Sequence, residues 1–277
     1  MGHIVPGVSA RTVRAETAEL DGLPVRWLEA PCDDPPILWV HGVPDSADVW
    51  RPFLARAGGI AVDLPGFGAS GKPAEWPYGA EGFLAFLERF LDARGVGRVR
   101  VVAHDWGSPA LLLGERIAAA VAIDVVPLLE GHTWHRFARL WRTRGLGELA
   151  MGLTSRRTLR WLGQLSNSHA AEVMTHFDHG TQRAILRLHR GADSAALARL
   201  GRRLENLRAP TLIVWGEDDP YLAPEWAARL AEALPGEPRV LRIAGAGHWP
   251  WQERPDAIEQ ICAFLEKTAQ SSPQDPA

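Results

Sequence analysis

A carboxylate flanked by small residues is the most specific chemical feature of the sequence. The motif A-H-D-W-G, centred on Asp105, follows an apolar run that predicts a buried strand over residues 99–103. A sharp turn from strand to helix needs small residues two positions before and after its apex, because the backbone doubles back there. The pattern is typical of a nucleophile elbow with aspartate where serine is more common. The alternative is that Asp105 only caps a helix, since Asp is a favoured N-cap.

Four further loops carry polar or glycine-rich motifs directly after apolar strand candidates. They are H-G-V-P from His41, D-L-P-G-F-G from Asp63, G-E-D-D from Gly216 and G-A-G-H-W-P from Gly245. A nucleophile, an acid and a histidine therefore occur in that order along the chain, each on a loop after a strand. This is the order of the triad in α/β hydrolases.

The elements that must position these loops are short apolar strands alternating with helices. Strands are expected over residues 13–20, 23–29, 37–40, 60–62, 99–103, 120–125, 211–215 and 240–243. Helices are expected over residues 82–94, 109–117, 225–234 and 255–267. Asp21-Gly22 predicts a tight hairpin turn between the first two strands. Such alternation implies a mostly parallel sheet with helices on both faces.

The alternation stops between residues 128 and 208, where aromatic and apolar residues recur at helical spacing with no convincing strand. We interpret this segment as a helical cap, inserted into a core formed by residues 1–127 and 209–277. An insertion at the carboxyl edge of a parallel sheet lies above the usual ligand crevice. The simpler alternative is a covering layer without a role in binding.

Composition and charge exclude several classes of function. The 277 residues include 30 basic and 33 acidic side chains, and both signs are mixed along the chain, which disfavours nucleic-acid binding. No apolar run predicts a membrane span, and residues 1–10 do not have the pattern of a signal peptide. Two cysteines are too few for a disulfide framework. We therefore expect a cytoplasmic protein without a nucleic-acid or membrane partner.

Taken together, the five loop motifs resemble those of the α/β hydrolases, in the branch of haloalkane dehalogenases and epoxide hydrolases. The resemblance covers roughly residues 13–267 and is weakest in the cap. It implies an α/β-hydrolase fold, in which a mostly parallel eight-stranded sheet is flanked by helices and carries an inserted helical cap. It implies no cofactor.

The resemblance also implies roles for individual residues. Asp105 would be the nucleophile, His248 the base, and the backbone N–H groups of Val43 and Trp106 an oxyanion hole. Several aspartates near the ends of two predicted strands are candidates for the acid that orients the histidine. We favour Asp219, with Asp124 as the alternative and the neighbouring Asp218 as a third choice.

An aspartate nucleophile restricts the substrate. Attack of a carboxylate on an ester carbonyl would form an anhydride, whereas attack on saturated carbon forms an alkyl ester that water can cleave. A halide or a ring-opened alkoxide would then be the leaving group. We expect the partners to be a small apolar substrate and water.

The leaving group depends on which proton donors are present. Related epoxide hydrolases use two cap tyrosines, but the two tyrosines here, Tyr78 and Tyr221, lie outside the inserted segment. An alkoxide needs a proton in order to leave and a halide does not. We therefore predict a haloalkane dehalogenase-like hydrolase. An epoxide hydrolase using a cap His or Trp is the alternative, followed by an ester hydrolase or a non-catalytic binding protein.

Aromatic and imidazole side chains near these motifs are candidates for binding the substrate. The candidates are His41, Trp106, His132, Trp134, His135, Trp141, Tyr221 and Trp249, with Trp161 as a further possible indole donor. His176 and His179, with His169 nearby, lack a cysteine or carboxylate at ligand spacing, so we expect no metal site.

Overall fold

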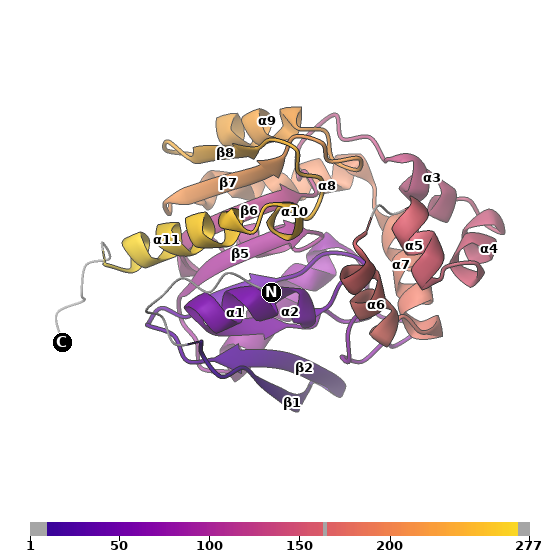
Figure 1. Cartoon of the computed structure of the whole chain (residues 1–277), viewed down its shortest axis with the longest axis horizontal. Helices are drawn as coiled ribbons and strands as arrows, with labels where there is room; N and C mark the ends of the chain where they lie inside the picture. Colours follow the sequence, from indigo (N-terminus) through magenta and orange to yellow (C-terminus); the bar gives the residue numbers. More distant parts are fainter. Residues whose placement is uncertain (1–9, 163–164, 271–277) are drawn as a thin grey trace.

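The computed structural model describes residues 10–162 and 165–270, and its central element is an eight-stranded sheet (Figure 1). The strands are β1 (Arg14–Leu20), β2 (Leu23–Ala30), β3 (Ile37–Val40), β4 (Gly59–Val62), β5 (Val99–Asp105), β6 (Ile117–Val125), β7 (Thr211–Gly216) and β8 (Arg239–Ile243). Their order is β1-β2-β4-β3-β5-β6-β7-β8. β2 pairs antiparallel with β1 and β4, and the remaining pairs are parallel, which confirms the predicted fold class.

Helices flank the sheet and continue into the segment between β6 and β7. The helices are α1 (Arg51–Ala57), α2 (Ala80–Ala93), α3 (Arg136–Arg142), α4 (Leu146–Gly152), α5 (Arg156–Leu162), α6 (Asn167–His176), α7 (His179–Gly191), α8 (Ser194–Gly201), α9 (Glu225–Ala233), α10 (Pro250–Glu253) and α11 (Asp256–Gln270). Short 3₁₀ helices are η1 (Ala47–Trp50), η2 (Ser108–Leu112), η3 (Gly114–Arg116) and η4 (Arg202–Asn206). Within the described part of the chain, no helix combines the length and apolarity that crossing a bilayer requires.

Side chains alternate along the strands and so build one apolar core on each face of the sheet. In β3, Leu38 and Val40 join one core, whereas Ile37 and Trp39 join the other. The first core is closed by α2 and α9 and the second by α1 and α11. Because successive residues of a strand point to opposite faces, a strand covered on both sides must be apolar throughout.

The helices α3 to α7 gather beyond the end of the sheet where the parallel strands finish (Figure 1). They follow β6 in the chain, and the chain then returns through α8 to β7. The division into a core (1–127 and 209–277) and a cap (128–208) remains our proposal for how the chain is organised.

Two local predictions were wrong or incomplete. Residues 109–117 form η2, η3 and the first residue of β6 rather than one α-helix. The Leu113 N–H bonds to the Ala110 carbonyl three residues back, and Gly114 then has a φ of +61°, which a continuing helix does not allow. The helix α1 was not predicted, because seven residues are too short for a reliable periodicity.

Candidate active site

Asp105 is the last residue of β5 and has an unusual backbone conformation. Its φ is +47°, in the left-handed region that residues other than glycine rarely adopt. Two glycines make room for this turn. A Cβ on Gly107 would lie 2.5 Å from the Val40 carbonyl oxygen, and a Cβ on Gly42 would lie 2.3 Å from the Asp105 Cβ. The residue that caps η2 is Gly107, so Asp105 does not act as the helix cap considered above.

The Asp105 carboxylate interacts with backbone N–H donors and faces an imidazole with its Oδ1. Its Oδ2 accepts a hydrogen bond from the Val43 N–H at 2.8 Å, and the Trp106 N–H is a second backbone donor to this carboxylate. Its Oδ1 lies 3.9 Å from His248 Nε2. Burial raises the pKa of Asp105 to about 6, although His248 and both N–H groups favour the charged form. At neutral pH the group is therefore a carboxylate with little solvation.

His248 is oriented by Asp219. The distance from His248 Nδ1 to Asp219 Oδ2 is 2.7 Å, and the other Asp219 oxygen accepts the N–H groups of Tyr221 and Leu222 at 2.7 and 3.0 Å. Burial alone would raise the pKa of Asp219, but these partners hold it below its usual value. Burial alone would likewise lower the pKa of His248, but the attraction of Asp219 and Asp105 raises it. The arrangement leaves Nε2 facing Asp105.

Asp124, the alternative acid, lies in a different environment. It is fully buried at the end of β6, where its Oδ1 accepts the Gly216 N–H at 3.0 Å and its Oδ2 has no hydrogen-bond partner among the described residues. Burial, and then the negative charge of Asp219, raise the pKa of Asp124 well above its usual value. Asp218, the third candidate, is exposed. Of the three carboxyls, the structure brings Asp219 into hydrogen-bond contact with His248.

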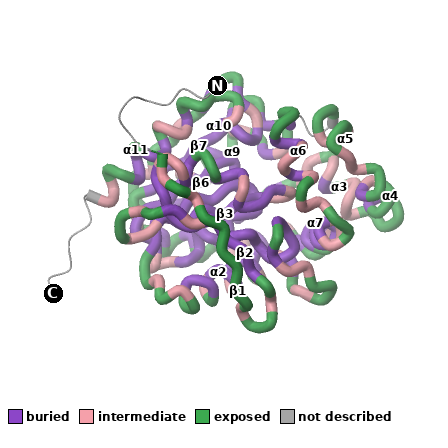
Figure 2. The backbone as a smooth tube through the Cα atoms, turned by 60° about the horizontal axis from the view of Figure 1, so that its bottom comes forward, coloured by how far each residue is buried: buried purple, intermediate pink, exposed green. Residues whose placement is uncertain are grey.

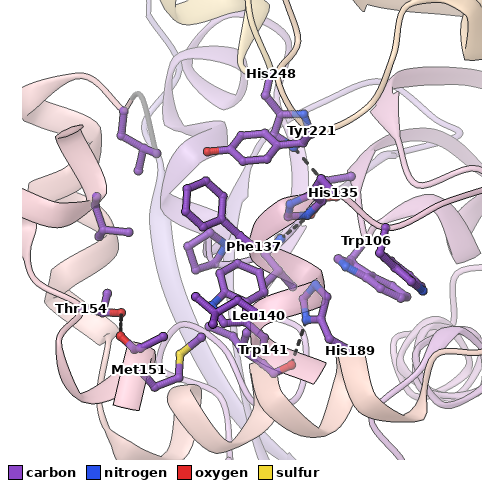
Figure 3. Close-up of a pocket in the computed structure, with 18 of the residues that line it drawn as sticks. Trp106, His135, Phe137, Leu140, Trp141, Met151, Thr154, His189, Tyr221 and His248 are labelled. Atoms are coloured by element: carbon purple, nitrogen blue, oxygen red, sulfur yellow. Dashed lines mark hydrogen bonds and ion pairs between the residues drawn. The ribbon is translucent and has the colours of Figure 1, made fainter. Parts of the chain in front are cut away.

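A cavity of about 350 Å³ is bounded by Asp105 and His248 together with aromatic and aliphatic side chains (Figure 3). This size lies within the range of small-molecule sites. Predicted binding residues that line it are Trp106, His132, Trp134, His135, Trp141, Tyr221 and Trp249. Further lining residues that the sequence did not single out include Phe137, Leu140, Met151, Phe177 and Ile185.

His189 is one of the cap histidines that could donate a proton, and it lines the cavity although the sequence favoured His132 and His135 over it. It is buried on α7, and its ring lies 4.8, 5.7 and 5.9 Å from those of Trp141, Trp106 and Trp134. Its position four residues after Ile185 puts both on one face of α7, and this spacing was the available signal. Nothing in the local sequence showed that this face lines the cavity.

The three cap imidazoles of the cavity are neutral at physiological pH. Burial lowers the pKa of His132 to about 4, that of His135 to about 3 and that of His189 to about 4. Their tautomers also follow from their contacts. His135 Nδ1 accepts the Ala138 N–H, so its proton is on Nε2, whereas His189 Nδ1 donates to the Ile185 carbonyl.

Two candidate binding residues do not reach the cavity. His41 is fully buried, where its Nδ1 donates to the Gly42 carbonyl at 2.7 Å and its Nε2 accepts the Leu64 N–H at 3.0 Å. Both ring nitrogens therefore hold the loop after β3, and the prediction that His41 contacts substrate is wrong. Trp161 is 75 % exposed on α5 and lies outside the cavity lining.

The histidines considered for a metal site have separate partners. His169 bonds to Asp45, the His176 ring faces Asp48 and His179 bonds to Gln182. Within the described residues, no group of three or more histidine, cysteine or carboxylate side chains could hold a metal ion.

Comparison with known proteins agrees with this architecture. The model of the alpha/beta hydrolase fold family matches residues 35–255, and the chain belongs to this family. Epoxide hydrolase A of Mycobacterium tuberculosis is 26 % identical over 295 aligned residues, which cover 84 % of this chain and 89 % of that protein. A haloalkane dehalogenase of Bradyrhizobium diazoefficiens is 28 % identical over 275 aligned residues, which cover 83 % of this chain and 86 % of that protein.

Solved structures show the same fold. Haloalkane dehalogenase DbeA from Bradyrhizobium elkani superimposes with a TM-score of 0.78 at 22 % identity, covering 94 % of this chain and all of that one. The names of the sequence relatives support a hydrolase.

Proposed function

We propose that the protein hydrolyses small apolar substrates at a saturated carbon, with Asp105 as nucleophile, in the manner of a haloalkane dehalogenase. One observation carries this proposal. A buried carboxylate accepts the Val43 N–H on one oxygen, has the Trp106 N–H as a further donor and faces an imidazole with the other oxygen, in an apolar cavity. The first oxygen is positioned to carry negative charge in a later step, and the second is free to attack.

In the first step, Asp105 Oδ1 attacks the carbon that bears the halogen. The new C–O bond forms as the carbon–halogen bond breaks, and the halide departs with the bonding electron pair. The product is an alkyl ester of Asp105. Low solvation of the carboxylate and exclusion of water by the apolar lining both favour this displacement.

In the second step, His248 Nε2 removes a proton from water while the water oxygen attacks the Asp105 carbonyl carbon. The negative charge that develops on Oδ2 is stabilised by the Val43 and Trp106 N–H groups, each worth about 3 kcal/mol in comparable oxyanion holes. Collapse breaks the ester bond and releases the alcohol, which takes the proton from His248. Collapse leaves Asp105 as a carboxylic acid, which passes its proton to His248 and from there to solvent, and the carboxylate is regenerated.

A halide leaving group fits the cavity better than an alkoxide. The cap imidazoles are neutral, so none of them is available as an imidazolium acid for an alkoxide. A halide needs only N–H donors, which indoles supply without transferring a proton. Trp106, Trp134 and Trp141 all line the cavity, and the first two stack at 5.8 Å.

Epoxide hydrolysis is the second candidate, because one tyrosine does line the cavity. The Tyr221 ring lies 5.1 Å from that of His248, and burial raises the pKa of the Tyr221 hydroxyl, which keeps it protonated. A phenol in this position could donate to an epoxide oxygen. The similarity to epoxide hydrolase A of Mycobacterium tuberculosis also supports it.

Trapping the covalent intermediate tests the proposed nucleophile. We expect His248→Gln, incubated with 1-bromobutane, to release about one equivalent of bromide and to accumulate a butyl ester on the peptide containing Asp105. The matched control is Asp105→Asn with His248→Gln, which should release no bromide and carry no adduct. Bromide release without an adduct on Asp105 would exclude the mechanism.

A second measurement separates the two leaving groups. The wild-type protein is incubated with 1-bromobutane and with styrene oxide, and bromide and diol are quantified under the same conditions. If the protein is a dehalogenase, we expect bromide release to exceed diol formation. The Tyr221→Phe variant should then release bromide as the wild type does. Diol formation that is lost in Tyr221→Phe would instead establish epoxide opening.

A further inference from the structure

The outermost cap helices expose a group of large apolar side chains. Leu146, Leu149 and Leu153 on and just after α4 are 53, 60 and 64 % exposed, and Trp161 on α5 is 75 % exposed. We call these four residues the cap-tip patch. The leucines follow a spacing of three and four residues, which aligns them along one side of the helix. Across the described residues, the single other large apolar side chain with comparable exposure is Val240 on β8.

The chain segment that carries this patch is rich in arginine. Residues 131–171 contain seven arginines and one acidic residue, Glu148, which pairs with Arg190 at 2.7 Å. Six of the arginines are exposed and have no acidic partner among the described residues: Arg136, Arg139, Arg144, Arg156, Arg157 and Arg160. The chain as a whole carries a net charge of −3, so this region differs sharply from the rest. The mixed charge inferred from the complete sequence does not hold here.

The cap-tip patch is continuous with the wall of the cavity. Leu153 belongs to the patch and also lines the cavity. Thr154, Thr158 and Leu159, which are close to it in the chain, line the cavity without belonging to the patch. In Figures 1 and 2, α4 and α5 lie at the outer end of the cap helices, away from the sheet. A flat surface could therefore approach α4 and α5 without meeting the sheet.

We propose that the cap tip docks on an anionic lipid surface. The leucines and Trp161 would enter the boundary between headgroups and acyl chains, and the arginines would contact lipid phosphates, as in other amphipathic surface helices. Such docking needs no membrane-spanning segment, but it is contrary to the sequence-based expectation of no membrane partner, which rested on the absence of a span. It would also bring the cavity wall close to the acyl chains of the bilayer, where apolar substrates concentrate. This consequence rests on the proposed function.

Charge favours lipid over a second copy of the chain as the occupant. A symmetric dimer through this patch would bring the same surface of both copies together. Two clusters of unpaired arginines would then face one another and repel. An anionic lipid surface instead offers negative charge and apolar chains together.

Vesicle co-sedimentation tests the proposal without depending on turnover. The full-length protein is mixed with vesicles of phosphatidylcholine alone or of phosphatidylcholine with phosphatidylglycerol. We expect at least tenfold stronger partitioning onto the anionic vesicles, which weakens with added salt. Replacing Arg157 and Arg160 by Gln should reduce it by about fivefold for each arginine removed.

Apolar variants distinguish insertion from charge attraction alone. Leu146→Ser combined with Leu149→Ser should lower partitioning about tenfold or more, since both leucines are largely exposed. Neither lines the cavity, so activity on a water-soluble substrate should remain unchanged. Val240→Ser, at the exposed edge strand β8, is the matched control and should bind vesicles as the wild type does.

Three results would overturn the proposal. The first is equal partitioning onto neutral and anionic vesicles, and the second is vesicle binding that the leucine variant does not change. The third is a concentration-dependent dimer in sedimentation equilibrium that the leucine variant abolishes, which would assign the patch to a second copy. None of these depends on which substrate the enzyme hydrolyses.

Discussion

Two buried carboxylate–imidazole pairs lie close together in this molecule, but their surroundings differ. Asp219 contacts His248 at 2.7 Å, and Asp45 contacts His169 on α6 at 2.6 Å. The Trp249 ring lies 4.8 Å from that of His248 and 4.7 Å from that of His169. By distance alone the two pairs are equivalent.

The difference lies in what the second nitrogen of each imidazole meets. His248 Nε2 faces Asp105 and the cavity, whereas His169 Nδ1 is buried with no partner among the described residues. Asp45 is also held on its other oxygen by the Trp249 indole N–H at 2.8 Å. The first pair has a reactive atom and a cavity beside it, and the second joins the loop after β3 to a cap helix.

The comparison teaches that a perturbed acid–imidazole pair does not by itself define a catalytic site. Burial alone would raise the pKa of Asp45, but its contacts with His169 and the Trp249 indole N–H lower it to about 2. The pKa of Asp219 is lowered for a similar reason. We infer that Asp45 and His169 fasten the cap to the core, while Asp219 and His248 act on substrate.

Removing the charge from the Asp219 pair should have the largest effect on turnover. We expect Asp219→Asn to lower kcat by about 10⁴-fold, because an amide favours the wrong imidazole tautomer and does not stabilise the imidazolium. Steady-state bromide release measures the loss. A decrease below about tenfold would mean that Asp219 does not orient the base, and the comparison between the pairs would fail.

The same change in the second pair should affect stability instead. We expect Asp45→Asn to lower the free energy of unfolding by about 3 kcal/mol, since it removes the charge from a buried carboxylate that bonds to both His169 and Trp249. Urea denaturation followed by circular dichroism measures this, and turnover below the melting temperature should change by less than about threefold. His169→Gln is the matched variant. If either variant abolished turnover while remaining folded, this pair too would have a catalytic role.

The pH dependence separates the pairs in another way. The mechanism needs both groups deprotonated, and the pKa of Asp105 is about 6 while that of His248 is above its usual value. Turnover should therefore begin to fall as pH decreases below the His248 pKa, by about tenfold per unit, and more steeply below 6, where Asp105 is protonated as well. The depressed pKa of Asp45 contributes stability that is present above about pH 4 and is lost as pH falls toward 2. The stability difference between wild type and Asp45→Asn should therefore shrink as pH falls from about 4 toward 2. A difference that stays unchanged across that range would contradict the assignment.

The smallest effect is expected at Asp124. Burial raises the pKa of Asp124 well above its usual value and so favours its neutral form, which Asp124→Asn replaces by an amide of similar shape. The amide can still accept the Gly216 N–H through its oxygen. Turnover at pH 7 should remain within about threefold of wild type. A loss comparable to that of Asp219→Asn would show that both carboxyls support His248.

Local sequence patterns were sufficient for the fold and for the loops that carry the chemistry. Apolar runs and turn residues act over a few positions, so the eight strands and the hairpin turn at Asp21-Gly22 were predicted correctly. Short elements were harder to predict: one α-helix was expected over residues 109–117, which instead form two short 3₁₀ helices and the first residue of β6. His41 shows a further limit, since a histidine in a glycine-rich motif gives no sign of whether its nitrogens are already bonded.

The sequence by itself determined that a carboxylate stands at a tight turn after a strand, followed along the chain by acids and a histidine, because such motifs depend on neighbouring residues. Only the tertiary structure decided that Asp219 rather than Asp124 contacts His248, that His189 lines the cavity, and that leucines and arginines gather at the cap tip. These contacts join residues far apart in the chain. They depend on how helices and loops pack, which no local pattern specifies.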